Sequence, residues 1–348
     1  MNATISERSK KILQALAPGD ALSRVSIEQA IGESRDNTIR ELKRLVEQGY
    51  VTTEGDARAT VYAIAQRART IVLWDAEEYL AQEPDKRHAL YTSLTPELFA
   101  TIKESIGKLP ADVEKTASKR RIVGDSVTAR KDLERFVIEL SWKSSKIEGN
   151  TYSLLDTERL IKEAKEATGH PHDEAVMILN HKKAFEYVWE NQQLFKELTK
   201  TQLEEVHQLL VEGLGVPTGL REHPVGITGT VYVPPASKIE IAPYLQDIIG
   251  TINDITEPAE KAMASLMLIA YLQPFADGNK RTSRLIANAV LLAHGYPPLS
   301  YRSVDEQAYK GALIVFYEQG SLANFRELYL KQLEDSVKNY YFPIPKVQ

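Results

Sequence analysis

The residues best suited to chemistry stand together in Gln273–Arg284, which reads Gln-Pro-Phe-Ala-Asp-Gly-Asn-Lys-Arg-Thr-Ser-Arg. The apolar segment before it predicts a helix that ends near Gln273, and a second helix is expected to begin near Asn279. Gly278 therefore stands directly before a helix N-terminus, where glycine tolerates backbone angles that other residues avoid. Because free backbone N–H groups and the helix dipole attract anions there, the stretch predicts a site for a negatively charged group.

Three charged side chains of this stretch suit a polyphosphate with a bound metal ion. Asp277 supplies a hard oxygen ligand of the kind that Mg²⁺ prefers beside phosphates. Arg281 and Arg284 are three residues apart and share a helix face, from which each can bind phosphate oxygens in a bidentate manner. The alternative is an ordinary turn between two helices, with both arginines on the surface. The turn, the carboxylate and the arginines together favour a polyphosphate-binding loop.

Mostly helical segments are expected to position this loop. From about Asp132 onward, apolar residues recur with helical spacing. The exception is Gly226–Ile241, where Thr230–Val233 precedes two prolines and predicts a short β-hairpin or flap. The expected fold class is therefore mainly α, a helical core with a short β-hairpin flap. The expected helices are 132–143, 153–168, 173–192, 199–213, 242–256, 259–273, 280–294, 305–319 and 321–340.

Residues 1–66 show a different pattern. Three short amphipathic helices are expected, followed by two strands around a turn. This order is typical of a winged helix-turn-helix domain. The third helix places Ile39, Leu42 and Leu45 on its apolar face. The side chains that such a recognition helix would present to DNA are Arg35, Asn37, Thr38, Arg40, Lys43 and Arg44.

The charge of this N-terminal module leaves its partner open. Nine Lys plus Arg stand against nine Asp plus Glu in residues 1–66, so the module is neutral. Neutral modules of this kind bind DNA in some proteins and serve as protein-contact domains in others. Three segments are thus expected: a winged helix-turn-helix domain at 1–66, a helical connector without predicted chemistry at 67–130, and a helical domain at 131–348.

Composition excludes several classes of protein. The 348 residues include no cysteine, which excludes disulfide frameworks, thiolate metal sites and cysteine nucleophiles. The net charge of −5 argues against a surface built entirely for nucleic acid, although it allows a local basic patch. The first residues lack the apolar core of a signal peptide, and apolar runs such as Leu266–Leu272 are too short to cross a bilayer. A cytoplasmic protein with no membrane segment is expected.

The loop resembles the signature of the Fic (fido) family of nucleotide transferases, His-Pro-Phe-x-Asp/Glu-Gly-Asn-Gly-Arg-x-x-Arg. The positions that fall in register are Pro274, Phe275, Asp277, Gly278, Asn279, Arg281 and Arg284. Ser144–Asn150 resembles the inhibitory-helix motif Ser/Thr-x-x-x-Glu-Gly/Asn that lies N-terminal to the core in one type of Fic protein. Gly219–Arg221 and the flap after it resemble the segment that docks the target chain. The resemblance covers about residues 130–335.

This resemblance implies transfer of AMP from ATP, with Mg²⁺, to a Ser, Thr or Tyr hydroxyl of a target protein. Glu148 would pair with Arg284, occupy the γ-phosphate position and hold ATP in an unproductive pose. A carboxylate and a phosphate do compete for one guanidinium. The implied roles are ATP and phosphate binding for Gly278, Asn279, Lys280, Arg281 and Arg284, metal binding for Asp277, inhibition for Ser144, Glu148 and Gly149, and target docking for Thr230, Val231, Tyr232 and Val233.

The sequence departs from the signature at the catalytic position, where Gln273 replaces the histidine. A glutamine amide does not accept a proton near neutral pH, whereas imidazole titrates there. Loss of a general base costs about 10² to 10⁴ in rate. Three interpretations stay open: an engineered change, a natural nucleotide-binding pseudoenzyme, or residual chemistry in which Gln273 only positions the hydroxyl. His223 and His294 are the other histidines considered, and nothing in the sequence brings either to the loop.

Lys280 is the second departure, since glycine is usual there. Lysine also occurs at this place in the Doc branch, which transfers phosphate. That branch lacks the glycine present here as Gly278, so the nucleotidyl orientation is favoured. AMP transfer and phosphate transfer both stay open.

The function predicted is a Fic-type protein adenylyltransferase, autoinhibited by Glu148 and inactive or weak because of Gln273. The alternative is a nucleotide-sensing, DNA-binding transcriptional regulator built on a degenerate Fic domain. The expected partners are ATP, a hydroxyl-bearing target protein and, through the winged helix, DNA. Removal of AMP from a modified target is a further activity that the inhibitory motif leaves open, as is a homodimer, because many Fic proteins dimerise.

Overall fold

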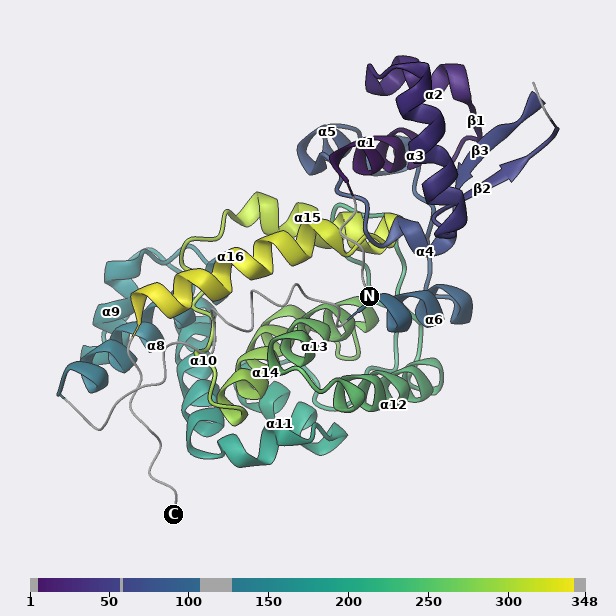
Figure 1. The fold of residues 1–348 in the computed structure, drawn as a ribbon. Coiled ribbons are helices and arrows are strands. Elements are labelled where there is room, and N and C mark those ends of the chain that lie inside the picture. The colour runs from purple at the N-terminus through teal and green to yellow at the C-terminus, as the bar shows by residue number, and fades with distance from the viewer. Residues whose placement is uncertain (1–5, 57–58, 107–126, 341–348) are drawn as a thin grey trace. The chain divides into compact units, whose positions relative to one another are not determined.

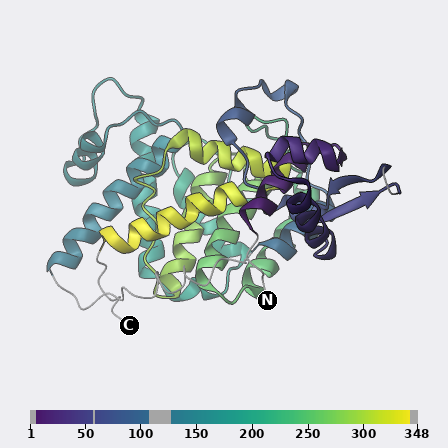
Figure 2. The same ribbon diagram turned by 45° about the horizontal axis from the view of Figure 1, so that its top comes forward.

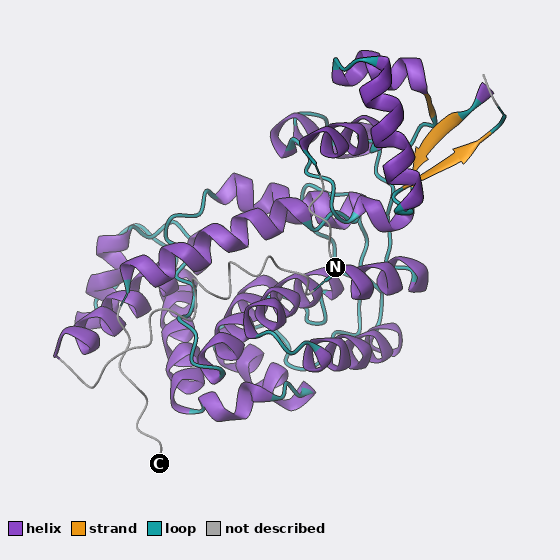
Figure 3. Ribbon diagram, viewed as in Figure 1, coloured by secondary structure: helices purple, strands orange, loops and turns teal. Residues whose placement is uncertain are grey.

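The computed structural model describes residues 6–56, 59–106 and 127–340. Helices dominate, and the strands of these residues form one small antiparallel sheet near the N-terminus (Figure 3). No helix in the described ranges is both long and apolar enough to span a membrane. The mainly α class expected from the sequence is confirmed.

The chain divides into two compact units, coloured along the chain in Figure 1. The first contains Met1–Ile106, Ile227–Tyr232 and Gln307–Glu327. The second contains Gly107–Gly226, Val233–Glu306 and Leu328–Gln348. The first unit therefore combines three segments that are far apart in the sequence.

In the first unit, the N-terminal residues build three helices and a small sheet. Side-chain oxygens of Ser6 and Ser34 accept hydrogen bonds from the first turns of the first and third helices, which fixes where they begin. The sheet order is β1-β3-β2, and Val51 lies opposite Ile64. The elements are α1 Glu7–Leu16, β1 Leu22–Ser23, α2 Arg24–Ile31, α3 Arg35–Glu47, β2 Val51–Glu54 and β3 Val61–Ile64.

Four short elements and the helix α15 complete the first unit. They are α4 Gln66–Arg69, α5 Ala76–Leu80, η2 Pro84–Lys86, α6 Pro96–Ser105 and α15 Glu306–Gln319. The connector and α15 are joined by backbone hydrogen bonds, since Leu90 and Tyr91 both donate to the carbonyl oxygen of Glu318 at 2.9 and 3.0 Å. Residues 67–106, which were expected to be part of a connector, therefore belong to the first unit.

One prediction for the third helix was wrong. Thr38 was expected on the exposed polar face, but it is fully buried, and its hydroxyl donates to the carbonyl oxygen of Ser34 at 3.0 Å. Ile39 was expected in the apolar core, but it is 41% exposed. Thr38, Leu42 and Leu45 are four and three residues apart, so they share the buried face of α3 and turn Ile39 outward.

The helices of the second unit surround a buried pair, α13 and α14 (Figures 1 and 2). Every residue from Lys261 to Leu272 is buried, as is every residue from Arg281 to Ala293. A helix that is buried on all sides gives a rigid frame for the residues at its ends. The elements are α8 Val127–Ile147, α9 Leu154–Glu163, α10 His172–Glu190, η3 Gln192–Lys196, α11 Lys200–Val211, α12 Lys238–Asp254, α13 Pro258–Leu272, α14 Asn279–Ala293 and α16 Ala323–Asn339, the last of which begins in the first unit.

The predicted β-hairpin at Gly226–Ile241 is not formed. Residues 226–237 contain turns, extended backbone and a single bridge residue, Val233, before α12 begins at Lys238. Pro234 and Pro235 have no N–H to donate to a ladder. The N–H of Val231 donates to the side chain of Glu318 at 3.1 Å, so a carboxylate takes the place of a partner strand.

Candidate functional site

The loop between α13 and α14 has the sharp geometry that its sequence predicts. The buried Gln273 ends α13 in the left-handed region, with φ 50° and ψ 58°. Gly278 begins α14 with φ 79° and ψ 4°, and no side chain caps that terminus. The side chain of Asn279 closes the loop, because it accepts from the N–H and donates to the carbonyl oxygen of Phe275, both at 2.8 Å. The uncapped start of α14 therefore leaves the backbone geometry that attracts anions, and the amide of Asn279 serves the loop itself.

His207 of α11 packs against this loop. Its ring stacks on Phe275 with centroids 3.7 Å apart and an interplanar angle of 10°. Burial is the main reason that the pKa of His207 falls to about 4. The ring is therefore neutral at pH 7, and its Nε2–H can donate to the carbonyl oxygen of Asp277 at 2.9 Å. No sequence pattern indicates His207, because it stands 70 positions before Asp277.

Arg281 and Asp277 form an unequal pair at the loop. The Arg281 side chain is 2% exposed, whereas that of Asp277 is 68% exposed. Arg281 donates from Nη2 to Asp277 Oδ2 at 3.2 Å and from Nη1 to the carbonyl oxygen of Leu210 at 3.3 Å. The Arg281 guanidinium is therefore buried and fixed by the carbonyl oxygen of Leu210, whereas the Asp277 carboxylate is exposed to solvent.

Arg284 lies one turn deeper and is completely buried. Its Nη1 donates to Glu148 Oε1 at 2.8 Å, its Nε to the hydroxyl of Ser144 at 3.0 Å, and its Nη2 to the carbonyl oxygen of Ser144 at 2.8 Å. The two segments that the resemblance paired, Ser144–Asn150 and Gln273–Arg284, are thus joined by hydrogen bonds. Gly149 follows with φ 101°, an angle that favours glycine and lets the chain turn away after α8.

Glu148 is ionised although it is largely buried. Burial alone would raise the pKa of this carboxyl, but the charges of Arg284 and then Lys280 outweigh it and hold the pKa below its usual value of 4.5. Lys280 Nζ lies 3.7 Å from Glu148 Oε2. The Glu148 carboxylate therefore neutralises part of the positive charge of Arg284 and Lys280.

His181 is a further buried residue near this pair. Burial, followed by the positive charges of Arg284 and Arg281, lowers the pKa of His181 to about 3. The imidazole is therefore neutral at pH 7. No pattern in the sequence distinguishes it from other histidines on helix faces.

Gln273 stands at the position of the family histidine, and both its side chain and its backbone form hydrogen bonds. Its Nε2 donates to the carbonyl oxygen of Ala270 at 2.6 Å. Its own carbonyl oxygen accepts from Nε of the buried Arg221 at 2.7 Å. Arg221 also donates to the carbonyl oxygens of His223, at 2.8 Å, and Pro235. The backbone at position 273 is thus fixed by Arg221.

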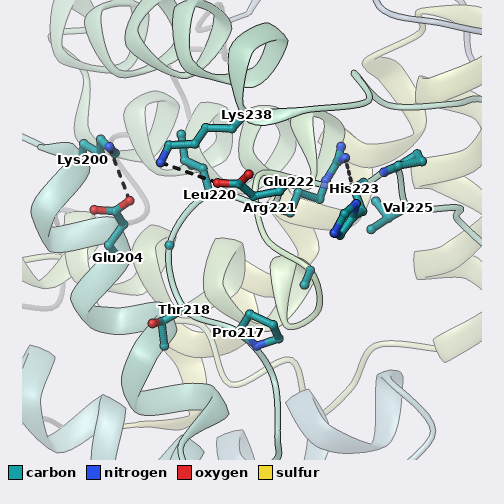
Figure 4. Close-up of a pocket in the computed structure, with 13 residues that line it drawn as sticks. Lys200, Glu204, Pro217, Thr218, Leu220, Arg221, Glu222, His223, Val225 and Lys238 are labelled. Atoms are coloured by element: carbon teal, nitrogen blue, oxygen red, sulfur yellow. Dashed lines mark hydrogen bonds and ion pairs between the residues drawn. The ribbon is translucent and has the colours of Figure 1, made fainter.

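A pocket of about 570 Å³ opens beside the loop at Ala276 (Figure 4). Its lining residues come from α11, the segment 217–225, Lys238 and Ala276. Figure 4 shows Lys200 directed at Glu204 and Lys238 directed at Glu222; the charged atoms are 3.6 and 3.9 Å apart. The charged groups of this pocket are therefore internally paired.

The two other histidines considered from the sequence lie outside the loop between α13 and α14. His294 ends α14, and its Nδ1 is 2.9 Å from the carbonyl oxygen of Val290. His223 lines the pocket beside Ala276 (Figure 4).

Of the flap residues, Thr230, Val231 and Tyr232 belong to the first unit, and Val233 belongs to the second.

A magnesium ion would meet one carboxylate here. No group of three or more His, Cys, Asp or Glu side chains suited to a metal is found in the part of the chain that the structure describes. Mg²⁺ bound with nucleotides characteristically uses one or two carboxylates, phosphate oxygens and water. The exposed Asp277 beside an anion-binding helix start fits that pattern.

Comparison with known families decides the class of this domain. Residues 197–291, which contain α11, the loop and most of α14, match the Fic/DOC family. This segment is therefore similar to the Fic/DOC family. It is 26% identical over 194 residues to the protein adenylyltransferase Fic of Nematostella vectensis and 27% identical over 208 residues to that of Drosophila virilis. Each match covers 54% of this chain and 45% or 42% of the relative, so the match spans less than half the length of either relative.

Solved structures of Fic proteins share the fold. Fic-1 of Caenorhabditis elegans, residues 134–508, aligns with a TM-score of 0.53 and 23% identity over 70% of this chain and 71% of that one. A Fic family protein of Desulfovibrio desulfuricans G20 aligns with a TM-score of 0.53 and 26% identity over 70% and 74% of the two chains. The Fic-like helical fold expected from the motif is confirmed.

The glycine before α14 provides a test of the loop. A Cβ on Gly278 would lie 3.0 Å from Val211 Cγ1, and the residue has φ 79°. We expect Gly278→Ala to lower the free energy of unfolding by about 1–2 kcal/mol, because alanine is strained in this region. Gly250→Ala, inside α12 with no atom within 4 Å of the new Cβ, should raise it by up to about 1 kcal/mol. Urea denaturation of both variants measures this, and a loss of stability in Gly250→Ala alone would contradict it.

The ion pair of Glu148 predicts a pH dependence. Because the folded-state pKa is lowered, the carboxylate contributes its full stabilisation above the ordinary pKa of 4.5 and loses it as the pH falls through the folded-state value. The difference in unfolding free energy between the unchanged chain and Glu148→Gln should therefore be constant from pH 7 to about pH 5.5 and shrink in more acidic solution. The exposed Glu327→Gln is the control and should differ by less than about 0.5 kcal/mol throughout. A difference that grows on acidification would contradict the ion pair.

Proposed function

We propose that this chain is an ATP-dependent protein adenylyltransferase of the Fic type, restrained by Glu148 and weakened by Gln273. The observation that carries the proposal is the hydrogen-bonded ion pair of Glu148 and the buried Arg284 beside the uncapped start of α14. An anion site at a helix N-terminus, occupied by a carboxylate of the same chain, suits an enzyme that is switched off by its own side chain.

The nucleotide would be held by its phosphates. The backbone N–H groups at the start of α14 and the guanidinium of Arg281 present positive charge to the loop, and Lys280 is near enough to reach the same anion. Asp277 would hold Mg²⁺, which, when bound, neutralises phosphate charge and polarises the phosphorus centre. Removal of the Glu148 carboxylate would take one acceptor from Arg284, and the outermost phosphate would take its place while both bonds to Ser144 remain.

The reaction would place AMP on a target hydroxyl. The hydroxyl oxygen forms a bond to the α-phosphorus of ATP, the bond to the bridging oxygen breaks, and pyrophosphate leaves. The hydroxyl proton must pass to a base. In this chain Gln273 stands at that position, and its Nε2 already donates to the carbonyl oxygen of Ala270, so the amide does not take the proton. Transfer by the unchanged chain is therefore slow.

A label-transfer experiment tests this function. We expect Gln273→His combined with Glu148→Gly to transfer label from α-labelled ATP with Mg²⁺ to itself or to a lysate protein. The unchanged chain should transfer about 10²- to 10⁴-fold less, because it lacks a general base. Histidine is suited to position 273 in one further respect, since it adopts the left-handed region more readily than most residues.

Three controls separate the steps of this experiment. Glu148→Gly alone should tighten ATP binding by roughly tenfold in calorimetry, because Arg284 gains a phosphate partner. γ-labelled ATP should leave no label on protein; label from it would mean phosphate transfer instead. Equal α-label transfer by the unchanged chain would contradict the role of Gln273, and no transfer by the double variant would reject the proposed function.

A second function, a DNA-binding regulator, is supported by the exposed face of α3. Arg35, Arg40 and Lys43 are exposed on that helix, next to the exposed Ile39. The helix precedes the two-stranded hairpin β2–β3, as in a winged helix-turn-helix domain. In this function the Fic domain senses nucleotide, and the N-terminal module binds DNA.

A gel-shift titration tests the regulator. With DNA from upstream of its own gene at 50 mM salt, we expect binding that weakens steeply on going to 200 mM, because phosphate contacts release counterions. Arg40→Ala should weaken binding by roughly tenfold, whereas Lys10→Ala, an exposed residue of α1, should not. Absence of binding at 50 mM salt, with and without ATP, would reject this second function.

A further inference from the structure

The strongest polar cluster outside the loop is centred on Glu318 of α15, whose side chain is 0% exposed. Its carboxylate accepts from Arg87 twice, with Nη2 at 2.9 Å and Nε at 3.1 Å. It also accepts from the hydroxyl of Tyr79 at 2.6 Å. Arg87 and Tyr79 come from the connector, where the sequence predicted no chemistry. A buried carboxylate needs such partners, because an unpaired buried charge is strongly destabilising.

The same carboxylate holds the segment that the resemblance assigned to target docking. Glu318 Oε1 accepts from the hydroxyl of Thr230 at 2.6 Å and from the N–H of Val231 at 3.1 Å. On the other side of the segment, Arg87 donates to the carbonyl oxygen of Gly229. The ion pair therefore bonds both the N–H and the C=O groups of this backbone, within the first unit.

The rest of the segment depends on this anchor for its shape. Thr230 also accepts from the N–H of Tyr232 at 3.1 Å, so one hydroxyl both donates to Glu318 and orders the next turn of backbone. The ring of Tyr232 is buried, and its centroid lies 5.4 Å from the ring centroid of Tyr317 on α15. Because residues 226–232 form no strand, a side-chain acceptor replaces the ladder that usually holds such backbone.

We propose that Glu318 and Arg87 are positioning residues for target docking: they fix the backbone of Gly229–Tyr232 so that an extended target chain can bind along Thr230–Tyr232. This rests on the proposed function. A segment that pairs with an extended peptide does so through its main chain, so its affinity depends on how rigidly that main chain is held. A loosened segment should weaken target binding and leave ATP binding unchanged.

The test uses the full chain carrying Gln273→His and Glu148→Gly as the reference. Added to it are Glu318→Gln, Thr230→Val, and Glu327→Gln as a matched control on an exposed carboxylate of the same unit. Three quantities are measured: amide hydrogen exchange of peptides covering 227–236, the dissociation constant of ATP by calorimetry, and transfer of α-label to the most strongly labelled lysate protein. Thr230→Val keeps the ion pair of Arg87 and Glu318, so it remains informative where Glu318→Gln does not fold.

We expect Thr230→Val and Glu318→Gln to speed exchange in 227–236 and to lower label transfer by roughly tenfold or more, the effect of losing a hydrogen bond to a charged group. The ATP dissociation constant should change less than about twofold, because the phosphate-binding residues are untouched. Glu327→Gln should match the reference in all three measurements.

Each other result decides against the proposal. Unchanged exchange in both variants would show that Glu318 does not hold the segment. Faster exchange with unchanged label transfer would show that the held backbone does not matter for docking. If the reference itself transfers no label, the proposed function fails, while the exchange data still decide whether Glu318 and Thr230 fix the segment.

Discussion

The structure depends on how a fully buried guanidinium, that of Arg284, is satisfied. Arginine stays charged in proteins, so its removal from water is tolerated only where acceptors surround it. Ser144 and Glu148 at the end of α8 provide three of those acceptors. The pairing fixes α8 against α14, and in the proposed function it places a carboxylate at the position of a phosphate. One interaction thus serves both the packing of the domain and the proposed restraint.

Buried polar groups also fix the loop before α14. Asn279 closes it, His207 supports it as a neutral ring, and Arg221 fixes the backbone at Gln273. Because these partners are buried and directional, the loop is preorganised before any nucleotide binds. At position 273 this loop presents a glutamine amide, which accepts no proton near neutral pH, on a backbone that Arg221 fixes.

Much of the fold followed from periodicity and from a short motif. Each helix expected after residue 131 has a counterpart in the described residues, because amphipathic repeats and helix-ending residues are local signals. The hairpin prediction at Gly226–Ile241 was wrong, since residues with strand propensity were bonded by the distant Glu318 instead. Thr38 and Ile39 were each predicted on the wrong face of α3. An error of one residue in the helical register rotates the predicted buried face by about 100°. Such errors arise where the deciding partner is remote.

The sequence alone determined the chemistry of the loop: Asp277, Gly278, Arg281 and Arg284 stand at spacings that a helix start converts into an anion site, and Gln273 lacks a titratable group. Only the tertiary structure decided which groups surround them. The neutral state of His207, the ionised state of Glu148 and the anchoring of Thr230 by Glu318 follow from burial and from charges brought together across the chain. Burial and charge depend on three-dimensional neighbours, and no spacing along the chain encodes them.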